Sequence, residues 1–379
     1  MVDDRVRLGR TVRRLPLLAI GMLSMAGGLW FGLIRLGWAL PLPRPDQLIV
    51  HGPLMVGGFL GTLICLERAV GLGRRWAYAA PVLTAAGAIC LLADTPVRPA
   101  AALITLGSLG LIAIFLVVCR RQPTLFSATL ALGAAAWFVG NARWCHGASI
   151  YRAVPWWMAF LVLTIAGERL ELNRVLRPAR GVRAVFVAAI GVTLAGSAIT
   201  FATAPFGIRV LGGGLVLLAA WLLRYDIARR TVRARALTRY MGAALLAGYV
   251  WLAIGGALML ATGTLVPGTL YDATLHAVFL GFVMSMIFAH APVIFPAVLG
   301  VHIAYRPSFY SHLAVLHASL VVRVVGDLVP ALGAWRAWGG LFNAVALVLF
   351  VVNTVAAFGV KRHPVAVGVR GYPRAGDLG

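Results

Sequence analysis

Long apolar runs separated by short polar loops dominate the chain. Twelve of these runs are close to the roughly 20 residues that an α-helix needs to cross the hydrocarbon core of a bilayer. They are continuous rather than alternating, which excludes the ten-residue strands of a membrane β-barrel. The pattern therefore predicts an all-α integral membrane fold with twelve transmembrane helices. The runs cover residues 15–40, 48–70, 76–93, 99–118, 124–145, 154–172, 183–203, 207–223, 239–262, 270–298, 308–328 and 336–360.

Basic residues alternate between the loops that join these runs. Counted loop by loop, 26 of the 34 Lys and Arg residues fall on one side of the membrane and seven on the other. Because cytoplasmic loops collect positive charge, both termini are predicted to be cytoplasmic. We expect a basic cytoplasmic N-terminus over 1–14, a single transmembrane domain over 15–360 and a cytoplasmic tail over 361–379. The corresponding location is a bacterial inner membrane, crossed many times.

Composition supports this class and narrows the partners. The chain is 61% hydrophobic and 12% charged, with a mean hydropathy of +0.91, and soluble proteins carry about twice that charged fraction. A soluble enzyme and a disordered protein are therefore excluded. The net charge of +23 is explained by topology, so the expected partner is the lipid bilayer and not nucleic acid. No CxxC or CxxCH motif is present, so neither a thiolate metal site nor covalent haem attachment is predicted.

A weak internal repeat relates the second, sixth and tenth runs. The second run ends in Leu66-Glu67-Arg68 and the sixth in Gly167-Glu168-Arg169, at an offset of 101 residues. The tenth run lies four helices further on, and it opens with a histidine as the second does. This indicates three four-helix pseudo-repeats. The Glu-Arg pairs themselves are most simply interpreted as ion pairs at the membrane edge.

Two histidines at matching depth are the main candidates for chemistry. His51 and His276 both stand at the outer ends of long apolar runs, and glycines follow each of them. Small residues beside a helical histidine permit close approach of a neighbouring helix or of a flat macrocycle. Two neutral imidazoles from facing helices are the usual axial ligands of a low-spin haem b. The alternative is a pair of interfacial histidines, each bonded to a carbonyl or water.

Further candidates lie along the same and neighbouring helices. Met55 follows His51 by four residues, on the same helical face, and His with Met can hold copper(I). His290 lies near the cytoplasmic end of the tenth run, before two prolines, and His312 and His317 enter from the same end of the eleventh run. These three histidines are candidates for a second metal site, a proton path or a hydrogen-bonded polar cluster.

Charged residues inside or at the edge of the runs form the last group. Arg323 and Asp327 have i,i+4 spacing within the eleventh run and are predicted to form a structural ion pair. Arg323 is also a candidate contact for an anion such as a haem propionate. Arg143 and Arg152 lie at the outer edge among tryptophans. They fit interfacial anchoring and are further candidates for propionate contacts.

The segments His51-Gly-Pro-Leu-Met55-Val-Gly-Gly-Phe59 and His276-Ala-Val-Phe-Leu-Gly281-Phe-Val-Met resemble the histidine-bearing helices of the NnrS family. That resemblance implies a twelve-span bacterial haem and copper protein linked to nitric-oxide metabolism. The layout is also distantly similar to subunit I of the haem–copper oxidases, whose second and tenth helices carry low-spin haem ligands. The chain departs from the family pattern because the tandem His-x-His is reduced to one His.

Two functional hypotheses remain. The sixth to ninth runs contain no histidine, so an oxidase-type binuclear centre is not expected. The first hypothesis is a haem protein with a redox role or a role in the response to nitrogen oxides, served by a membrane or periplasmic electron-transfer partner. As an enzyme it would be a membrane oxidoreductase. The second is a proton-coupled secondary transporter of a small solute, with its site at a proline-broken tenth helix.

Overall fold

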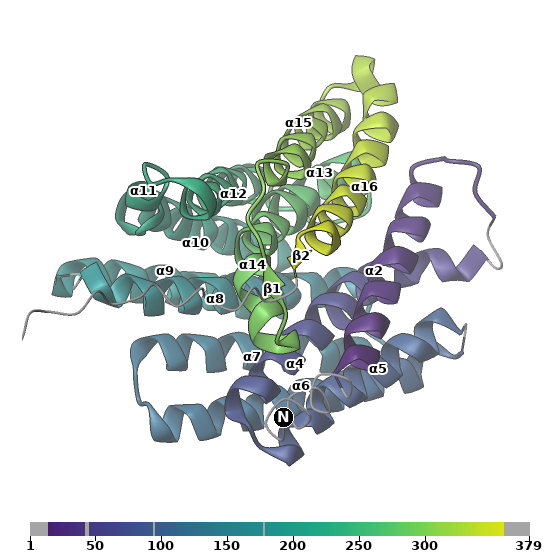
Figure 1. The fold of residues 1–379 in the computed structure, drawn as a ribbon. Coiled ribbons are helices and arrows are strands. Elements are labelled where there is room, and N and C mark those ends of the chain that lie inside the picture. Colours follow the sequence, from purple (N-terminus) through teal and green to yellow (C-terminus); the bar gives the residue numbers. More distant parts are fainter. Residues whose placement is uncertain (1–13, 42–44, 94, 177–178, 360–379) are drawn as a thin grey trace, which may run out of the picture.

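The computed structural model describes residues 14–41, 45–93, 95–176 and 179–359, and these form a helical bundle (Figure 1). Within this part of the chain, 12 helices are long and apolar enough to cross a membrane. The predicted twelve-helix, all-α membrane fold is therefore confirmed at that level. The strand content of the described residues is one antiparallel pair, β1 (His302–Ile303) with β2 (Phe358–Gly359).

Two of the spans contain a π-helical segment. The second span runs through η1 (Pro45–Val50), α3 (His51–Pro53), the π-helix η2 (Leu54–Gly61) and α4 (Thr62–Leu72). The tenth runs through α13 (Thr269–His276), the π-helix η5 (Ala277–Met284) and α14 (Ser285–Leu299). The others are α2 (Leu15–Arg35), η3 (Arg75–Tyr78) with α5 (Ala79–Leu92), α6 (Val97–Arg121), α7 (Leu125–Cys145), α8 (Ile150–Asn173) with η4 (Arg174–Leu176), α9 (Arg180–Ile199), α10 (Ala204–Tyr225), α12 (Ala236–Thr262), α15 (Phe309–Leu328), and η6 (Pro330–Leu332) with α16 (Gly333–Ala356).

Short connections make consecutive helices antiparallel neighbours. The pairs α7–α8, α15–α16, α10–α12 and α9–α10 pack most extensively, and the four-residue α11 (Ala228–Thr231) lies in the loop before α12. Close packing of α10 against α12 depends on Gly212 and Gly256. A Cβ on either glycine would lie 2.6–2.8 Å from the carbonyl oxygen of the other. Small residues of this kind let transmembrane helices approach closely without a hydrophobic driving force.

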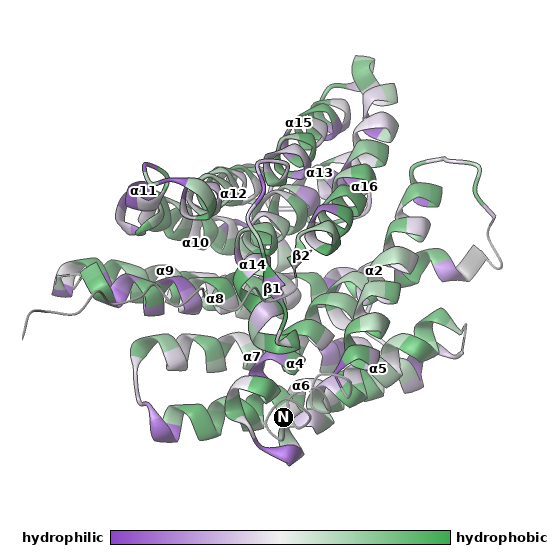
Figure 2. Ribbon diagram, in the orientation of Figure 1, coloured by the Kyte–Doolittle hydropathy of each residue, from purple (hydrophilic) through white to green (hydrophobic). Residues whose placement is uncertain are grey.

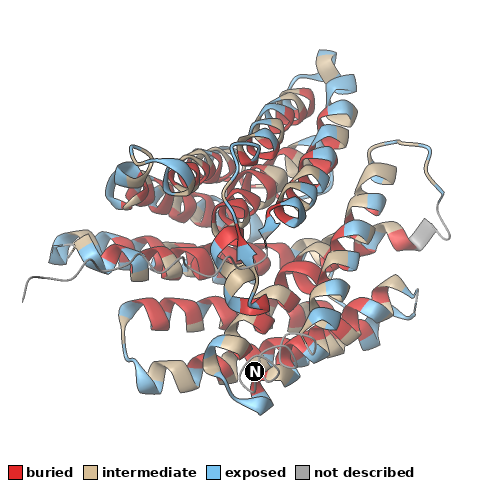
Figure 3. Ribbon diagram, viewed as in Figure 1, coloured by how far each residue is buried: buried red, intermediate tan, exposed pale blue. Residues whose placement is uncertain are grey.

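The outer surface of the bundle is apolar. Large apolar side chains are exposed on most helices, and the ribbon coloured by burial has exposed positions along most of them (Figure 3). A soluble protein of this size would cover such area with polar groups. Figure 2 shows the most hydrophilic segments mainly at helix ends and loops. Exposed examples are Leu23, Leu116, Phe206, Val348 and Val352. This surface suits a multi-pass membrane protein.

The second, sixth and tenth spans form the centre of the bundle. They have the largest buried shares of the twelve, and the sixth, α8, is the most buried of all. They are the helices that the sequence repeat relates. The second and tenth spans each contain an eight-residue π-helical segment, which starts three residues after His51 in one and directly after His276 in the other. Because π-helical turns are rare and concentrate at functional sites, these two spans mark where a site is expected.

Candidate functional site

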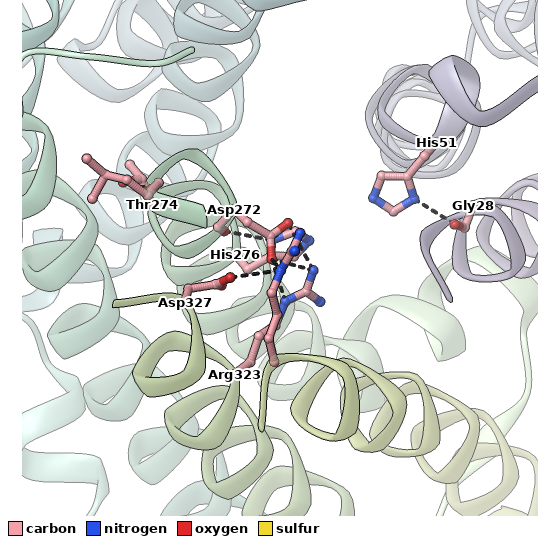
Figure 4. Close-up of polar contacts among 9 residues, drawn as sticks. Gly28, His51, Asp272, Thr274, His276, Arg323 and Asp327 are labelled. Atoms are coloured by element: carbon pink, nitrogen blue, oxygen red, sulfur yellow. Dashed lines mark hydrogen bonds and ion pairs between the residues drawn. The ribbon is translucent and has the colours of Figure 1, made fainter. Parts of the chain in front are cut away.

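The structure brings His51 and His276 face to face. His51 begins α3 and His276 ends α13, and their ring centroids lie 6.4 Å apart with the ring planes inclined by 32°. In Figure 4 the ring of His51 points across a gap toward the helix that carries His276. The sequence predicts that both histidines lie at the same depth, and in the structure their rings face each other from two different helices.

Both rings are held by their Nδ1 atoms. The Nδ1 of His51 is 2.6 Å from the carbonyl oxygen of Gly28 in α2, and the Nδ1 of His276 is 2.8 Å from the carbonyl oxygen of Asp272. A carbonyl oxygen only accepts, so each Nδ1 donates a hydrogen. Each Nε2 then keeps its lone pair, which is the state that a metal-binding imidazole requires.

A cavity of about 140 Å³ lies between the two histidines. Its lining comes from six spans and is mainly apolar, with Leu29, Val56, Val154, Trp157, Phe279 and Leu280 among its members. The polar and charged groups in the lining, apart from the two imidazoles, are Arg35, Tyr151, Tyr271, Asp272, Arg323, Arg336 and Asn343. Met55 also lines it, so the predicted sulfur ligand stays beside His51. The site combines a wide apolar wall with a charged group of residues.

The glycine that accommodates the His51 ring lies on another helix. A Cβ on Gly32 of α2 would lie 3.0 Å from the Cε1 atom of His51, so the imidazole rests against the backbone of α2. Of the glycines that follow the two histidines, Gly57 faces Ile104 and Gly281 faces Trp251, so these two permit close approach of helices. Gly52, directly after His51, lines the cavity instead.

The predicted Arg323–Asp327 pair does not form. The Nε and Nη2 atoms of Arg323 donate to the two carboxylate oxygens of Asp272 at 3.0 and 3.1 Å. Asp327 instead pairs with Arg336 at 2.9 Å. The reason is a close crossing of α15 and α16 at Gly326, where a Cβ would collide with the backbone of Arg336. That crossing brings Arg336 to Asp327 and leaves Arg323 free to face α13.

Asp272 is the functional residue that sequence reasoning missed. Its backbone carbonyl holds His276, its Oδ1 lies 3.3 Å from the same Nδ1, and its carboxylate binds Arg323. Arg336 approaches the same carboxylate at 3.6 Å. A signal was available, because Asp272 is the one acidic residue of the predicted tenth run and precedes His276 by a single helical turn.

Arg143 and Arg152 do not belong to this site. Neither lines the cavity, and the Arg143 guanidinium lies over the ring of Phe201 at 4.1 Å from its centroid. The arginines that do line the cavity are Arg35, Arg323 and Arg336. Of the three predicted anion contacts, Arg323 alone is therefore placed where it can act on the histidine cavity.

The other three candidate histidines do not gather into one cluster. His290 binds the carbonyl oxygen of Met286 through Nδ1 and lies 3.3 Å from Arg169. His312 and His317 each have their own partners, which are Tyr240 and Asn353 for His312 and Trp251 and Ser285 for His317. Among the described residues, no group of three or more His, Cys, Asp or Glu side chains is placed to hold a metal. A shared second metal site from these histidines is therefore not formed.

The Glu-Arg motifs of the repeat are not simple edge pairs. Arg68 contacts both Glu67 and Glu168, so it links the second span to the sixth. Arg169 is buried and binds both carboxylate oxygens of Asp226 at 2.9 Å. The prediction of local pairs within each motif is therefore wrong for Glu168 and Arg169, because central helices exchange partners across their contacts.

Fold and site together define a polytopic helical bundle with a half-buried pair of facing histidines in its central helices. The chain belongs to the family described as Domain of unknown function (DUF8744), whose sequence model matches residues 14–358. A comparison with curated proteins finds no match.

Proposed function

We propose that the protein is a haem-binding membrane protein in which His51 and His276 are the axial ligands of one low-spin haem b. The ring separation carries this proposal. Two imidazoles on opposite faces of one metal, each bonded at about 2 Å, place their ring centroids about 6.3 Å apart. The observed separation is 6.4 Å. Among the described residues both hydrogen-bonded ring nitrogens are Nδ1 atoms, so the two Nε2 lone pairs are available to a metal.

The chemistry of the lining suits a macrocycle with acidic side groups, which would enter only with repacking of side chains because the cavity measures about 140 Å³. The apolar wall is contributed by α2, η2, α8, η5 and their neighbours, which is far more surface than a lone metal ion contacts. Arg35, Arg323 and Arg336 stand at this wall, and arginine is well suited to bind carboxylates such as propionates. These arginines would hold the group by its charged edge while the two histidines hold its centre.

The residues favour electron transfer over binding of an external ligand. A haem bound here would supply one-electron redox chemistry. Because His51 and His276 would both hold the group, no position would remain open for a substrate, and helix-borne histidines with fixed Nδ1 partners would change geometry little between oxidation states. A redox role, or a role in the response to nitrogen oxides, is consistent with the resemblance to the NnrS family. An electron-transfer partner would then act from the membrane or the periplasm.

The proposed orientation puts the histidine cavity near the outer face of a bacterial inner membrane. The excess of Arg and Lys on one side supports an N-in, C-in topology. The central position of the second, sixth and tenth spans supports three four-helix pseudo-repeats. For topology, we expect a reporter that is active only in the cytoplasm to work when fused to either end of the chain, and activity of an exclusively periplasmic reporter at either end would contradict the assignment.

Copper is the second candidate, and two observations favour it. Met55 lines the same cavity as both histidines, and the cavity measures about 140 Å³, which suits a single ion without repacking of side chains. Two imidazoles and a thioether form a set that copper(I) accepts. Copper held by both histidines would occupy the place of the haem iron, so the two proposals exclude each other at this cavity.

Substitution of Met55 distinguishes the two metals. Met55→Leu conserves volume and removes the sulfur. If haem is the cofactor, we expect unchanged haem content in this variant. Metal analysis of the purified protein provides the control. If the wild type contains about one copper per chain and the variant contains none, the cofactor of this cavity is copper and not haem.

The direct experiment is an absorption spectrum. The protein purified from haem-replete cells should be red, with separate α and β bands after reduction and about one haem b per chain. A colourless protein that contains no haem would contradict the proposed function.

A further inference from the structure

A second cavity lies toward the other end of the same three central spans. It measures about 110 Å³ and is lined by Glu67 of α4, Glu168 of α8 and His290 of α14, among apolar side chains such as Ile64, Ile165 and Ile287. Leu60 lines both this cavity and the histidine cavity. The polar groups at this end therefore line a partly open, largely apolar space.

One guanidinium serves both carboxylates. The Nη2 atom of Arg68 lies 3.3 Å from Glu67 Oε1 and hydrogen-bonds Glu168 Oε1. Both carboxylates lie near one nitrogen, so they are close to each other as well. The two carboxylate side chains are only 28% and 22% exposed. Their repulsion at this distance therefore favours protonation of one of them unless a second positive charge faces the pair.

Among the described residues, the other groups of positive or potentially positive charge that act on the pair are Arg169 and His290, and each has another partner. Arg169 is neutralised by Asp226, to which it donates two hydrogen bonds of 2.9 Å. The Nδ1 of His290 donates to the carbonyl oxygen of Met286, so its Nε2 accepts from Arg169 at 3.3 Å and the ring is neutral. Glu171, one turn after Glu168, adds a further negative charge that acts on Arg68.

We propose that Glu67 and Glu168 together bind one exchangeable proton. The proton comes from solvent and forms an O–H bond with a carboxylate oxygen of Glu67, whose contact with Arg68 is the longer one. Glu168 stays ionised and keeps its hydrogen bond to Arg68. On release the O–H bond breaks, the proton returns to water, and the cavity gains one negative charge. The site belongs to the pair, since either carboxylate can take the proton when the other holds Arg68.

This arrangement makes an unusual prediction for single substitutions. Glu67→Gln leaves Glu168 ionised on Arg68, and Glu168→Gln leaves Glu67 ionised on Arg68. Either change therefore removes the excess charge and the proton together. Each variant retains one carboxylate–guanidinium pair, so we expect both to fold. A solitary protonated glutamate would respond to only one of the two substitutions.

The experiment is infrared difference spectroscopy of the full chain in nanodiscs during a change of pH. We expect one protonated-carboxyl C=O band that titrates in the wild type, is lost in Glu67→Gln and in Glu168→Gln, and persists in the matched control Glu171→Gln. A band that survives either of the first two substitutions would overturn the proposal, as would its absence from the wild type at every pH. Displacement of the band by Na⁺ but not by K⁺ would make the site a sodium site and also overturn it.

The proton site does not depend on the haem proposal, and the two can fail separately. A colourless protein that shows the titrating band would refute the haem assignment alone. A red protein without the band would refute the proton site alone.

Discussion

Replacing either His51 or His276 by alanine is expected to abolish haem binding. In the proposed site each Nε2 would supply one of two axial bonds, so either substitution would leave the haem held by a single histidine. Substitution of a residue that only supports a metal ligand already lowers affinity by about tenfold or more. Loss of a direct ligand should therefore lower the haem content of the purified protein by at least about tenfold. Absorbance of the reduced haem, divided by protein concentration, measures this.

Controls separate ligand loss from unfolding. His302→Ala removes an exposed histidine and should leave the spectrum unchanged. His51→Gly leaves a hole of the shape of imidazole beside Gly32, and added imidazole should restore a low-spin spectrum to this variant. Normal haem content in either alanine variant would rule that histidine out as a ligand.

Asp272→Asn is expected to have the second largest effect. The carboxylate binds Arg323 through two hydrogen bonds and lies 3.6 Å from Arg336. Removing the charge leaves these guanidinium groups poorly compensated inside the bundle, which should lower the free energy of unfolding by roughly 3 kcal/mol. The backbone carbonyl that holds His276 is retained, so the tautomer survives and the axial ligand is still present. Haem affinity should fall by roughly tenfold because the support of that ligand is weakened.

The matched control for this variant is Asp327→Asn. Asp327 also pairs with an arginine, but that arginine is Arg336, whose side chain is one third exposed, and water can solvate it. We expect a smaller loss of stability and unchanged haem affinity, measured by unfolding and by haem titration of the apoprotein. Equal effects of the two substitutions on haem affinity would mean that Asp272 has no special role in positioning His276.

The number of spans was predictable because bilayer thickness fixes the length of an apolar run. Boundaries were less predictable. The first run was expected to reach residue 40, but α2 ends at Arg35 because Gly37 follows in a left-handed conformation with φ of 94°. The last run was expected to reach residue 360, whereas α16 ends at Ala356 and the chain continues into β2. Residues 1–13 and 360–379, which include the predicted tail, lie outside the described part.

The histidine pair was predictable from depth, but its supports were not. Matching positions on two runs indicated that His51 and His276 could meet. Nothing in local spacing indicates that Gly28 and Gly32 of α2 would hold the His51 ring, because that contact joins two different helices. The error at Arg323 has the same origin. An i,i+4 spacing permits a pair with Asp327, and the crossing of α15 with α16 decides against it.

The most direct test of the central claim is the electron paramagnetic resonance spectrum of the oxidised protein at low temperature. Bis-histidine ligation of one haem predicts a low-spin ferric signal. Imidazole planes inclined by 32° predict its rhombic form, in contrast to the strongly axial form given by perpendicular rings. A high-spin ferric signal, or a low-spin signal that persists in both His51→Ala and His276→Ala, would contradict the account.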